Sequence, residues 1–351
     1  MNISAPWLQK IFIDSFKEKS KFPTALLIVG DQNIGKIELA NAFAQRLLCQ
    51  NLAGDKDCGS CSSCHLLENG NHPDYHLITN EYSMRDCSDS FLRAASRYQL
   101  GTEKERSKRK TPKKTIVVEQ IRELVGNLSV SAHYGAEKVV IIYPAEDLNI
   151  NASNAMLKTL EEPTLKTYFL ILIKESYLLP ATIRSRCVKL TVPKPSGEIS
   201  LDWLRKQIKI ERSEAKVLLG LAEDSPFQAL DIYNNESITI LKTLPHDIFL
   251  IIENQISLGS IVEKWKNNQA RVILKWLQME IINAFRAAVG LNSSETGQLL
   301  YNKIGLIKCL EIYRKVGTFL SWPVNATDEK LFLEGTIIDL MKVRLVNQNE
   351  T

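Results

Sequence analysis

A glycine-rich loop that follows a short apolar run constrains the fold of this chain more than any other feature. From Gly30 the sequence reads Gly-Asp-Gln-Asn-Ile-Gly-Lys-Ile, which matches the phosphate-binding loop G-x-x-x-x-G-K-[ST] as far as Lys36. Gly30 and Gly35 allow backbone N–H groups to curl around phosphate oxygens, and Lys36 reaches the outer phosphates. The next position requires a hydroxyl group for Mg²⁺, but it holds Ile37. The sequence therefore predicts the fold around such a loop without its metal chemistry.

Apolar runs alternate with helical periodicities over the first half of the chain. The runs of strand length lie at 25–29, 75–78, 139–143, 168–173 and 188–192. Apolar residues with helical spacing occupy 7–16, 36–48, 121–128 and 154–160. This alternation favours right-handed crossovers and a mostly parallel sheet that helices cover on both faces. Only helical patterns follow the linker at 193–197, which reads Pro-Lys-Pro-Ser-Gly.

The acidic ligands that would hold the metal of a nucleotide site are also missing. At the end of the third expected strand, Tyr143 and Pro144 stand where an Asp-Glu pair would sit. Glu146 and Asp147 come later, and we interpret them as part of a loop or the start of a helix. In contrast, a Ser-Arg-Cys triplet around Arg186 is intact. A chain that keeps this arginine although its own nucleotide site is disabled is expected to use the arginine on the nucleotide of a neighbouring chain.

These segments, together with Leu-Lys-Thr-Leu-Glu-Glu-Pro at 157–163, resemble the delta-prime subunits of bacterial DNA polymerase III clamp loaders, which are non-hydrolysing members of the AAA+ superfamily. The resemblance runs from about residue 7 to residue 192 and continues more weakly beyond. It implies an α/β parallel-sheet P-loop (AAA+-like) domain, followed by a small helical lid domain and an all-α C-terminal domain. The implied boundaries are 1–192, with a zinc-binding insertion at 49–64 and a basic loop at 102–114, then 193–240 for the lid and 241–351 for a helical oligomerisation domain.

The resemblance also implies a function. Such a chain is a regulatory and structural subunit that helps to load the sliding clamp onto primed DNA, with the gamma/tau motor subunits and the delta subunit as partners. Carried over to this sequence, the trans-acting arginine finger is Arg186, with Ser185 and Cys187 as its motif neighbours. Gly30, Gly35 and Lys36 would form a degenerate loop without ATP hydrolysis of its own. The holoenzyme to which such subunits belong is a DNA-directed DNA polymerase, a nucleotidyltransferase.

Two other function classes compete with this interpretation. One is an active motor ATPase of the gamma/tau type, which Ile37, Tyr143 and Pro144 argue against. Ile173-Lys174 and Phe227 also stand where the resemblance places the two sensor residues of active motor subunits. The other class is a zinc-dependent nucleic-acid-binding module, which the limited basic sequence disfavours.

The most specific metal signal is the spacing Cys49-x8-Cys58-x2-Cys61-x2-Cys64. Four thiolates can close a tetrahedral shell around Zn²⁺, and the two C-x-x-C steps point paired sulfurs inward. A closed shell has no position for water, so the site is predicted to be structural. The alternatives are that Cys49 is a buried helix residue outside the site, or that His65 competes as a ligand. The remaining cysteines are interpreted as core or partly exposed thiols: Cys87, Cys187 and Cys309.

The net charge of +4 is concentrated in one short segment. Residues 102–114 hold seven basic and two acidic residues, a surplus of five positive charges, so the rest of the chain is close to neutral. We interpret this segment as a solvated loop, with weak contact to DNA phosphates as the alternative. No apolar run approaches the roughly 18 residues of a membrane span, and no export signal is recognisable at the N-terminus. We therefore expect a cytoplasmic protein without a membrane partner.

Overall fold

The computed structural model describes residues 3–16, 22–52, 54, 57–84, 88–107, 112–130, 132–133, 137–234, 238–265, 270–322 and 328–341. The chain forms two compact units, Met1–Trp203 and Leu204–Thr351. The boundary between them falls within helix α9 (Gly197–Gln207). The division into three domains, with boundaries after residues 192 and 240, stays a prediction. Cys87 lies outside the described residues.

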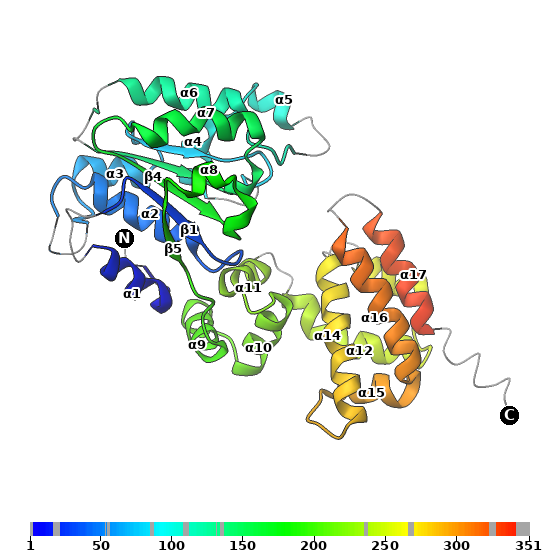
Figure 1. Ribbon diagram of the computed structural model, residues 1–351. Coiled ribbons are helices and arrows are strands. Elements are labelled where there is room, and N and C mark those ends of the chain that lie inside the picture. The colour runs from blue at the N-terminus through cyan, green and yellow to red at the C-terminus, as the bar shows by residue number, and fades with distance from the viewer. Residues whose placement is uncertain are drawn as a thin grey trace, which may run out of the picture. The chain divides into compact units, whose positions relative to one another are not determined.

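A five-stranded parallel sheet forms the centre of the first unit (Figure 1). Its strands are β1 (Ala25–Val29), β2 (Tyr75–Ile78), β3 (Lys138–Ile142), β4 (Thr167–Ile173) and β5 (Val188–Thr191). Their order across the sheet is β2-β3-β4-β1-β5. The predicted fold class is therefore confirmed, and β1, which leads into the glycine loop, lies between β4 and β5.

The register brings the carboxyl ends of the strands to one edge of the sheet. Val29 at the end of β1 is opposite Ile173 in β4 and Thr191 in β5, and Ile78 in β2 is opposite Ile142 in β3. The segments that follow these strands therefore leave the sheet on the same side. In open parallel sheets this edge is where ligands are usually bound.

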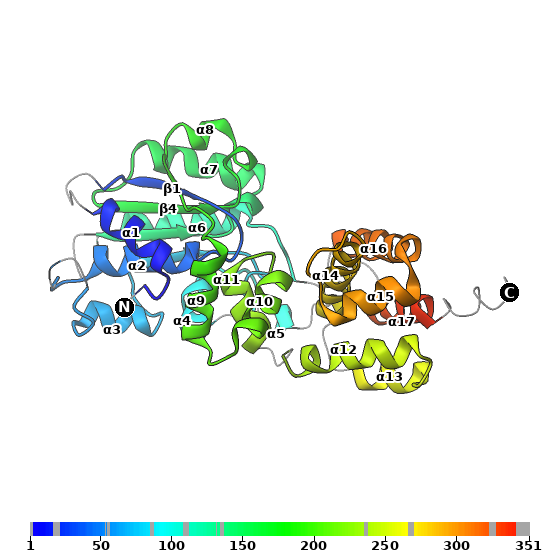
Figure 2. The same cartoon turned by 90° about the horizontal axis from the view of Figure 1, so that it is seen from below.

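Helices cover both faces of this sheet, as Figures 1 and 2 show. On one face, alternate strand residues such as Leu27, Val140 and Ile171 pack in a core cluster with α6 (Val118–Ser129) and α7 (Ile150–Glu161). On the other face, α2 (Lys36–Leu48) contacts β3 and β4, and α1 (Pro6–Ser15) packs on α2. Apolar side chains on both faces explain why β1 is apolar throughout and why β2, β3 and β4 are mostly apolar. The exceptions are His76 inside β2 and Lys138 and Thr167 at the starts of β3 and β4.

The remaining helices of the first unit are short. They are α3 (Ser62–Glu68), α4 (Asp89–Ser96), α5 (Glu103–Ser107) and α8 (Ala181–Arg184), with 3₁₀ turns at Ala145–Asp147 and Ser176–Leu178. Helix α5 corrects the expectation that 102–114 is a loop throughout. A reciprocal capping box stabilises the start of this helix. The Thr102 N–H donates to Glu105 Oε2 at 2.8 Å, and the Glu105 N–H donates to Thr102 Oγ1 at 3.3 Å.

The described part of the second unit contains helices and no strand. Beyond α9 its helices are α10 (Arg212–Leu221), α11 (Pro226–Ile232), α12 (Ile238–Ile252), α13 (Leu258–Trp265), α14 (Ala270–Ala288), α15 (Glu295–Ile304), α16 (Leu306–Ser321) and α17 (Glu329–Met341). Helix α14 contacts α10, α12, α15, α16 and α17, and so forms the centre of this unit. Among the described helices of the whole chain, none combines the length and apolarity that a membrane crossing requires.

A buried carboxylate joins two helices of the second unit. Asp247 on α12 is fully buried, and its oxygens accept hydrogen bonds from Lys264 Nζ at 2.5 Å and from Trp265 Nε1 at 3.0 Å on α13. Thr243 Oγ1 adds a longer contact at 3.4 Å. A buried charge is tolerated only when it is paired and hydrogen-bonded, and these contacts provide both.

We expect Asp247→Ala to lower the free energy of unfolding by about 1–3 kcal/mol, because it leaves the buried Trp265 N–H without its acceptor. Lys264 is partly exposed, so its own charge can be solvated and adds little to this loss. Urea titrations of the wild type and the variant measure the effect. Glu311→Ala is the control, because it removes an exposed ion pair with Lys308 and should change stability by less than about 0.5 kcal/mol. Equal effects of the two substitutions would contradict the structural role of Asp247.

Candidate functional site

The glycine loop lies between β1 and α2, and its backbone explains both predicted glycines. Gly35 has a φ of 96° directly before α2, a left-handed conformation that favours glycine. At Gly30 a Cβ atom would lie 2.7 Å from both the carbonyl oxygen of Val192 and the side chain of Ile34. The local sequence thus folds as a phosphate-binding loop would require.

The lysine of this loop bonds to the loop itself. Lys36 is buried, and its Nζ donates to the carbonyl oxygens of Gly30 at 2.6 Å and Asp31 at 2.5 Å. Burial lowers the pKa of Lys36 to about 8, against the opposing effect of the nearby Glu146 carboxylate. In addition, the Ile34 carbonyl accepts a hydrogen bond from Trp7 Nε1 at 2.9 Å. The Lys36 ammonium group and three carbonyls of the loop therefore have partners within the chain.

The loop after β3, at the same edge of the sheet, does not carry its acids as a metal site would. The Tyr143 N–H donates to the Ile78 carbonyl at 3.0 Å. Pro144 is followed by the 3₁₀ turn Ala145–Asp147, which agrees with the expectation that Glu146 and Asp147 belong to a loop or the start of a helix. Asp147 Oδ2 accepts from Asn80 Nδ2 at 2.6 Å, and burial raises the pKa of Asp147 to about 6. Within the described ranges, these acids belong to no group with metal-binding spacing.

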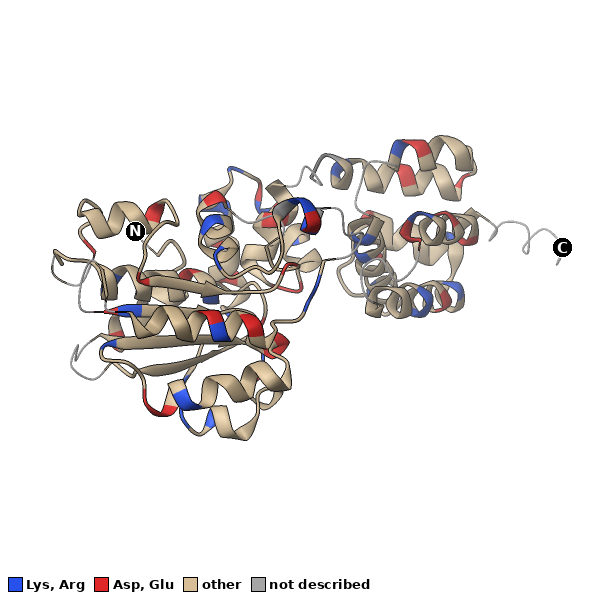
Figure 3. Ribbon diagram, turned by 90° about the horizontal axis from the view of Figure 1, so that it is seen from above, with Lys and Arg blue, Asp and Glu red and all other residues tan. Residues whose placement is uncertain are grey.

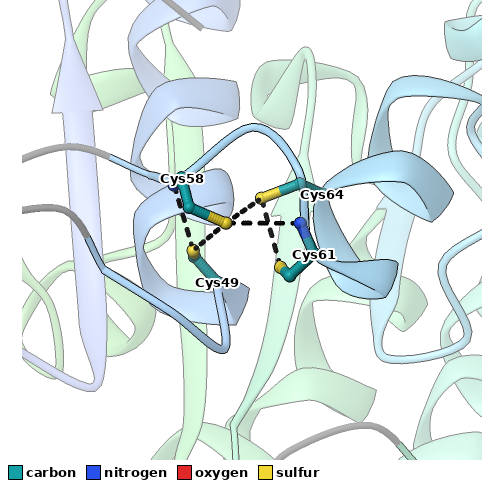
Figure 4. Close-up of side chains that lie close together, drawn as sticks. All are labelled: Cys49, Cys58, Cys61 and Cys64. Atoms are coloured by element: carbon teal, nitrogen blue, oxygen red, sulfur yellow. Dashed lines mark hydrogen bonds between the residues drawn. The ribbon is translucent and has the colours of Figure 1, made fainter.

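Four cysteine side chains converge at the end of α2, as Figure 4 shows. The sulfur of Cys58 lies 3.6 Å from that of Cys49 and 3.9 Å from that of Cys64, and the Cys61 and Cys64 sulfurs are 3.5 Å apart. All four sulfurs lie within 4.8 Å of one another. Zn–S bonds of about 2.3 Å imply sulfur separations of about 3.8 Å in a regular tetrahedron. The predicted set is thus brought together with the separations that a metal ion requires.

Local backbone geometry positions these sulfurs and favours the thiolate form of Cys58. Cys49 follows the last residue of α2, and Cys61 is the N-cap of α3, which carries Cys64. The Cys58 N–H donates to Cys49 Sγ and the Cys61 N–H donates to Cys58 Sγ, both at 3.3 Å. Backbone hydrogen bonds from Ser60 and Cys61 lower the pKa of Cys58 to about 6, which favours the thiolate. His65 is not part of the group.

Arg186 is held at the surface of the first unit by contacts to two helices. Its Nη1 donates to the Thr182 carbonyl at 2.6 Å and makes a longer contact of 3.4 Å to Ser185 Oγ. Its Nη2 pairs with Glu161, the last residue of α7. Cys187, the next residue, packs against the core, and burial raises the pKa of its thiol to about 11. About a third of the Arg186 side chain is exposed.

Glu161 is the partner that sequence reasoning missed. It belongs to the segment 157–163, which was singled out for its resemblance and not for a contact to Arg186. Twenty-five residues separate the two side chains, and the packing of α7 against α8 brings them together. Spacing along the chain carries no signal for such a contact.

The described part of the basic segment makes internal contacts. Arg106 Nη1 donates to the Gly101 carbonyl at 2.7 Å, and Lys114 Nζ lies 4.3 Å from the centre of the Tyr82 ring. Residues 108–111 lie outside the described residues, so the predicted solvated loop stays a prediction there. Figure 3 shows both signs of charge on the helices of each unit.

The comparisons with known proteins agree with the motifs. A family model described as DNA polymerase III, delta subunit, matches residues 7–196. A Pseudomonas aeruginosa protein named DNA polymerase III subunit delta' is 31% identical over 272 residues, which are 77% of this chain and 74% of that protein. The chain belongs to the DNA polymerase III delta' family. The resemblance stated from the glycine loop, the Ser-Arg-Cys triplet and the segment 157–163 is thereby confirmed.

Further relatives of this delta' family member cover similar shares of the chain. The Escherichia coli K12 protein of the same name is 29% identical over 283 residues, which are 80% of this chain and 76% of that protein. Among solved structures, a DNA polymerase III gamma subunit-related protein from Thermotoga maritima is 15% identical and has a TM-score of 0.48, with 96% of this chain and 99% of that chain covered.

The burial of Lys36 in this delta' family member predicts a pH-dependent stability. Because its folded pKa of about 8 is below the unfolded value of 10.5, the unfolded state binds more protons between these two pH values. We expect the free energy of unfolding of the wild type, relative to Lys36→Met, to rise by up to about 3 kcal/mol between pH 8 and pH 10.5. Urea titrations across this range measure it.

Lys330→Met, at an exposed side chain, controls for the loss of one positive charge. A difference between wild type and Lys36→Met that stays constant across the range would contradict the burial of a charged Lys36.

Proposed function

We propose that this chain is a non-hydrolysing subunit of a clamp loader, which places the sliding clamp on primed DNA, and that Arg186 acts on the nucleotide of an adjacent motor subunit. The family supports membership in the DNA polymerase III machinery. The observation that carries the proposal is the position of Arg186 relative to the glycine loop of its own chain.

Arg186 and the glycine loop lie at opposite ends of a pair of strands. Val188 at the start of β5 is opposite Leu26, whereas Thr191 at its end is opposite Val29, which directly precedes the loop. Arg186 comes before β5, so the whole strand, roughly 13 Å at about 3.3 Å per residue, separates it from the loop edge. An arginine in this position cannot reach a phosphate on its own loop but is available to a neighbouring chain.

The contacts of Arg186 suit a group that must meet an incoming phosphate. Its Nη1 is anchored on the Thr182 carbonyl, whereas Nη2 pairs with a half-exposed carboxylate. Exposed ion pairs contribute only about 0–1 kcal/mol, so a phosphate can replace Glu161 at little cost. Stabilisation of transition-state charge by such an arginine is worth roughly 10³–10⁵ in rate.

Hydrolysis by this chain itself is disfavoured at each step that needs a metal ion. Phosphoryl transfer requires a cation that neutralises the developing charge and a group that positions water. Ile37 lacks the hydroxyl group, Tyr143 and Pro144 replace the acids, and Lys36 already bonds to the loop carbonyls. The active motor ATPase of the gamma/tau type is therefore the less favoured function.

We expect Arg186→Ala to leave folding and assembly unchanged and to slow ATP turnover at the adjacent site of the reconstituted complex by about 10³-fold. Single-turnover hydrolysis in the presence of the clamp and primed DNA measures the effect. Arg184→Ala, an exposed cation two residues earlier, is the matched control and should keep the wild-type rate. A wild-type rate for Arg186→Ala would show that the arginine does not act in trans.

The four-cysteine group fits a structural Zn²⁺ ion held by Cys49, Cys58, Cys61 and Cys64. Zinc would supply folding energy to a short segment that contains glycine and serine, and four protein ligands leave no open position for catalysis. The donor set, the sulfur separations and the N–H···S hydrogen bonds all support this identity over Mg²⁺ or Ca²⁺, which prefer oxygen ligands.

We expect one zinc ion per chain in protein prepared without chelators, and less than a tenth of that in a Cys61→Ala/Cys64→Ala variant. Elemental analysis by mass spectrometry gives the stoichiometry. Cys309→Ala removes a buried thiol of the second unit and should retain the metal. Full zinc content in the double variant, or none in the wild type, would refute the assignment.

A further inference from the structure

We infer that Ser63 and His72 form a positioning pair that holds the metal-binding cysteines in place and ties them to strand β2. This inference rests on the zinc site proposed above and names residues that neither the cysteine spacing nor the family match assigns. Neither residue is a ligand in the four-cysteine group.

Ser63 joins the two halves of the cysteine group. It lies between Cys61 and Cys64 in the sequence, and its Oγ is 2.6 Å from the carbonyl oxygen of Leu48, the residue directly before Cys49. The same Oγ is 2.8 Å from His72 Nε2. Ser63 and His72 are both almost completely buried, at 0% and 1% exposure. A single hydroxyl group thus fixes the spacing between the end of α2 and the start of α3.

The partners determine the direction of every hydrogen bond in this chain of contacts. The Asp74 N–H donates to His72 Nδ1 at 3.1 Å, so Nδ1 is the acceptor and Nε2 carries the proton. His72 Nε2 therefore donates to Ser63 Oγ, whose own hydrogen goes to the Leu48 carbonyl. Because both ring nitrogens are engaged, His72 does not compete for the metal, and Ser63 uses its only donor hydrogen on the Leu48 carbonyl.

His72 is in turn anchored on the sheet. The guanidinium group of Arg97 donates to the carbonyls of His72 at 3.3 Å, Pro73 at 3.2 Å and Tyr75, the first residue of β2, also at 3.2 Å. The His133 N–H donates to both oxygens of the buried Asp74 carboxylate at 3.0 Å. These contacts give the segment 72–75 a fixed position, so that Ser63 is held against a rigid support.

This arrangement couples metal binding to the docking of the cysteine segment. A metal ion orders the four sulfurs relative to one another, whereas the Ser63–His72 contact orders two of the segments that carry them before the ion arrives. Partners that orient metal ligands typically contribute 10- to 100-fold to metal affinity. Coupling of this kind is reciprocal, so bound zinc should also strengthen the contacts of His72.

The test compares zinc affinities by chelator competition in the full-length chain. We expect Ser63→Ala and His72→Ala each to weaken zinc binding by 10- to 100-fold. His72→Gln, whose amide can still donate to Ser63, should recover part of the loss. Ser62→Ala is the matched control, because Ser62 is the exposed serine of the same Cys-x-x-Cys step, and it should stay within about threefold of the wild type.

Two further measurements separate positioning from a general loss of stability. In a Ser63→Ala/His72→Ala double variant the two losses of zinc affinity should not add, because both substitutions interrupt one chain of hydrogen bonds. Hydrogen exchange at the Asp74 amide should slow when zinc is added to the wild type but not when it is added to Ser63→Ala. Wild-type affinity in Ser63→Ala, or fully additive effects in the double variant, would overturn the inference. A wild type that binds no zinc would instead refute the proposed metal site, and the positioning role with it.

Discussion

The burial of β1 between β4 and β5 is the constraint on which the first unit depends. All five residues of β1 are apolar and buried, because neighbouring strands flank it and helices cover both faces. This placement delivers Gly30 to the carboxyl edge of the sheet and fixes Arg186 at the other end of the adjacent strand. The glycine loop and the arginine therefore lie at opposite ends of the β1–β5 pair by virtue of strand pairing alone. No later detail of side-chain geometry is needed for that separation.

The elements that sequence predicted best are those whose causes are local. β1, β2 and α2 begin and end where the sequence pattern predicts. The glycine loop marks the end of β1 and the start of α2, and burial on both faces of the sheet favours apolar residues in the strands. The group of four cysteines could also be predicted from the sequence, because spacers of two residues bring paired thiols together. In contrast, α7 (Ile150–Glu161) is longer than its apolar pattern, because Asn149 caps it by accepting the Ala152 N–H at 2.7 Å. A cap of this kind depends on one side chain outside the periodic residues.

The contacts that sequence did not predict join segments far apart in the chain. Glu161 with Arg186, and Ser63 with His72, are polar pairs whose spacing follows no helical or strand period. Each becomes evident only when the packing of helices on the sheet is known. The same is true of Trp7, whose indole N–H reaches the loop carbonyl of Ile34 across 27 positions. Such contacts decide how a site behaves, although the fold can be predicted without them.

Cys187 gives the orientation of Arg186 a simple origin. Its side chain packs into the core just before β5, whereas the preceding side chain is directed to the α7 end and the surface. Both residues lie in a hydrogen-bonded turn, in which the Arg186 N–H donates to the Ile183 carbonyl at 3.1 Å and the Cys187 N–H donates to the Arg184 carbonyl at 3.3 Å. This turn directs the two side chains to different surroundings. A deletion of one residue between Ile183 and Val188 would remove this turn and with it the position of the guanidinium group. The turn that places Cys187 against the core thus also sets the direction from which Arg186 could meet another chain.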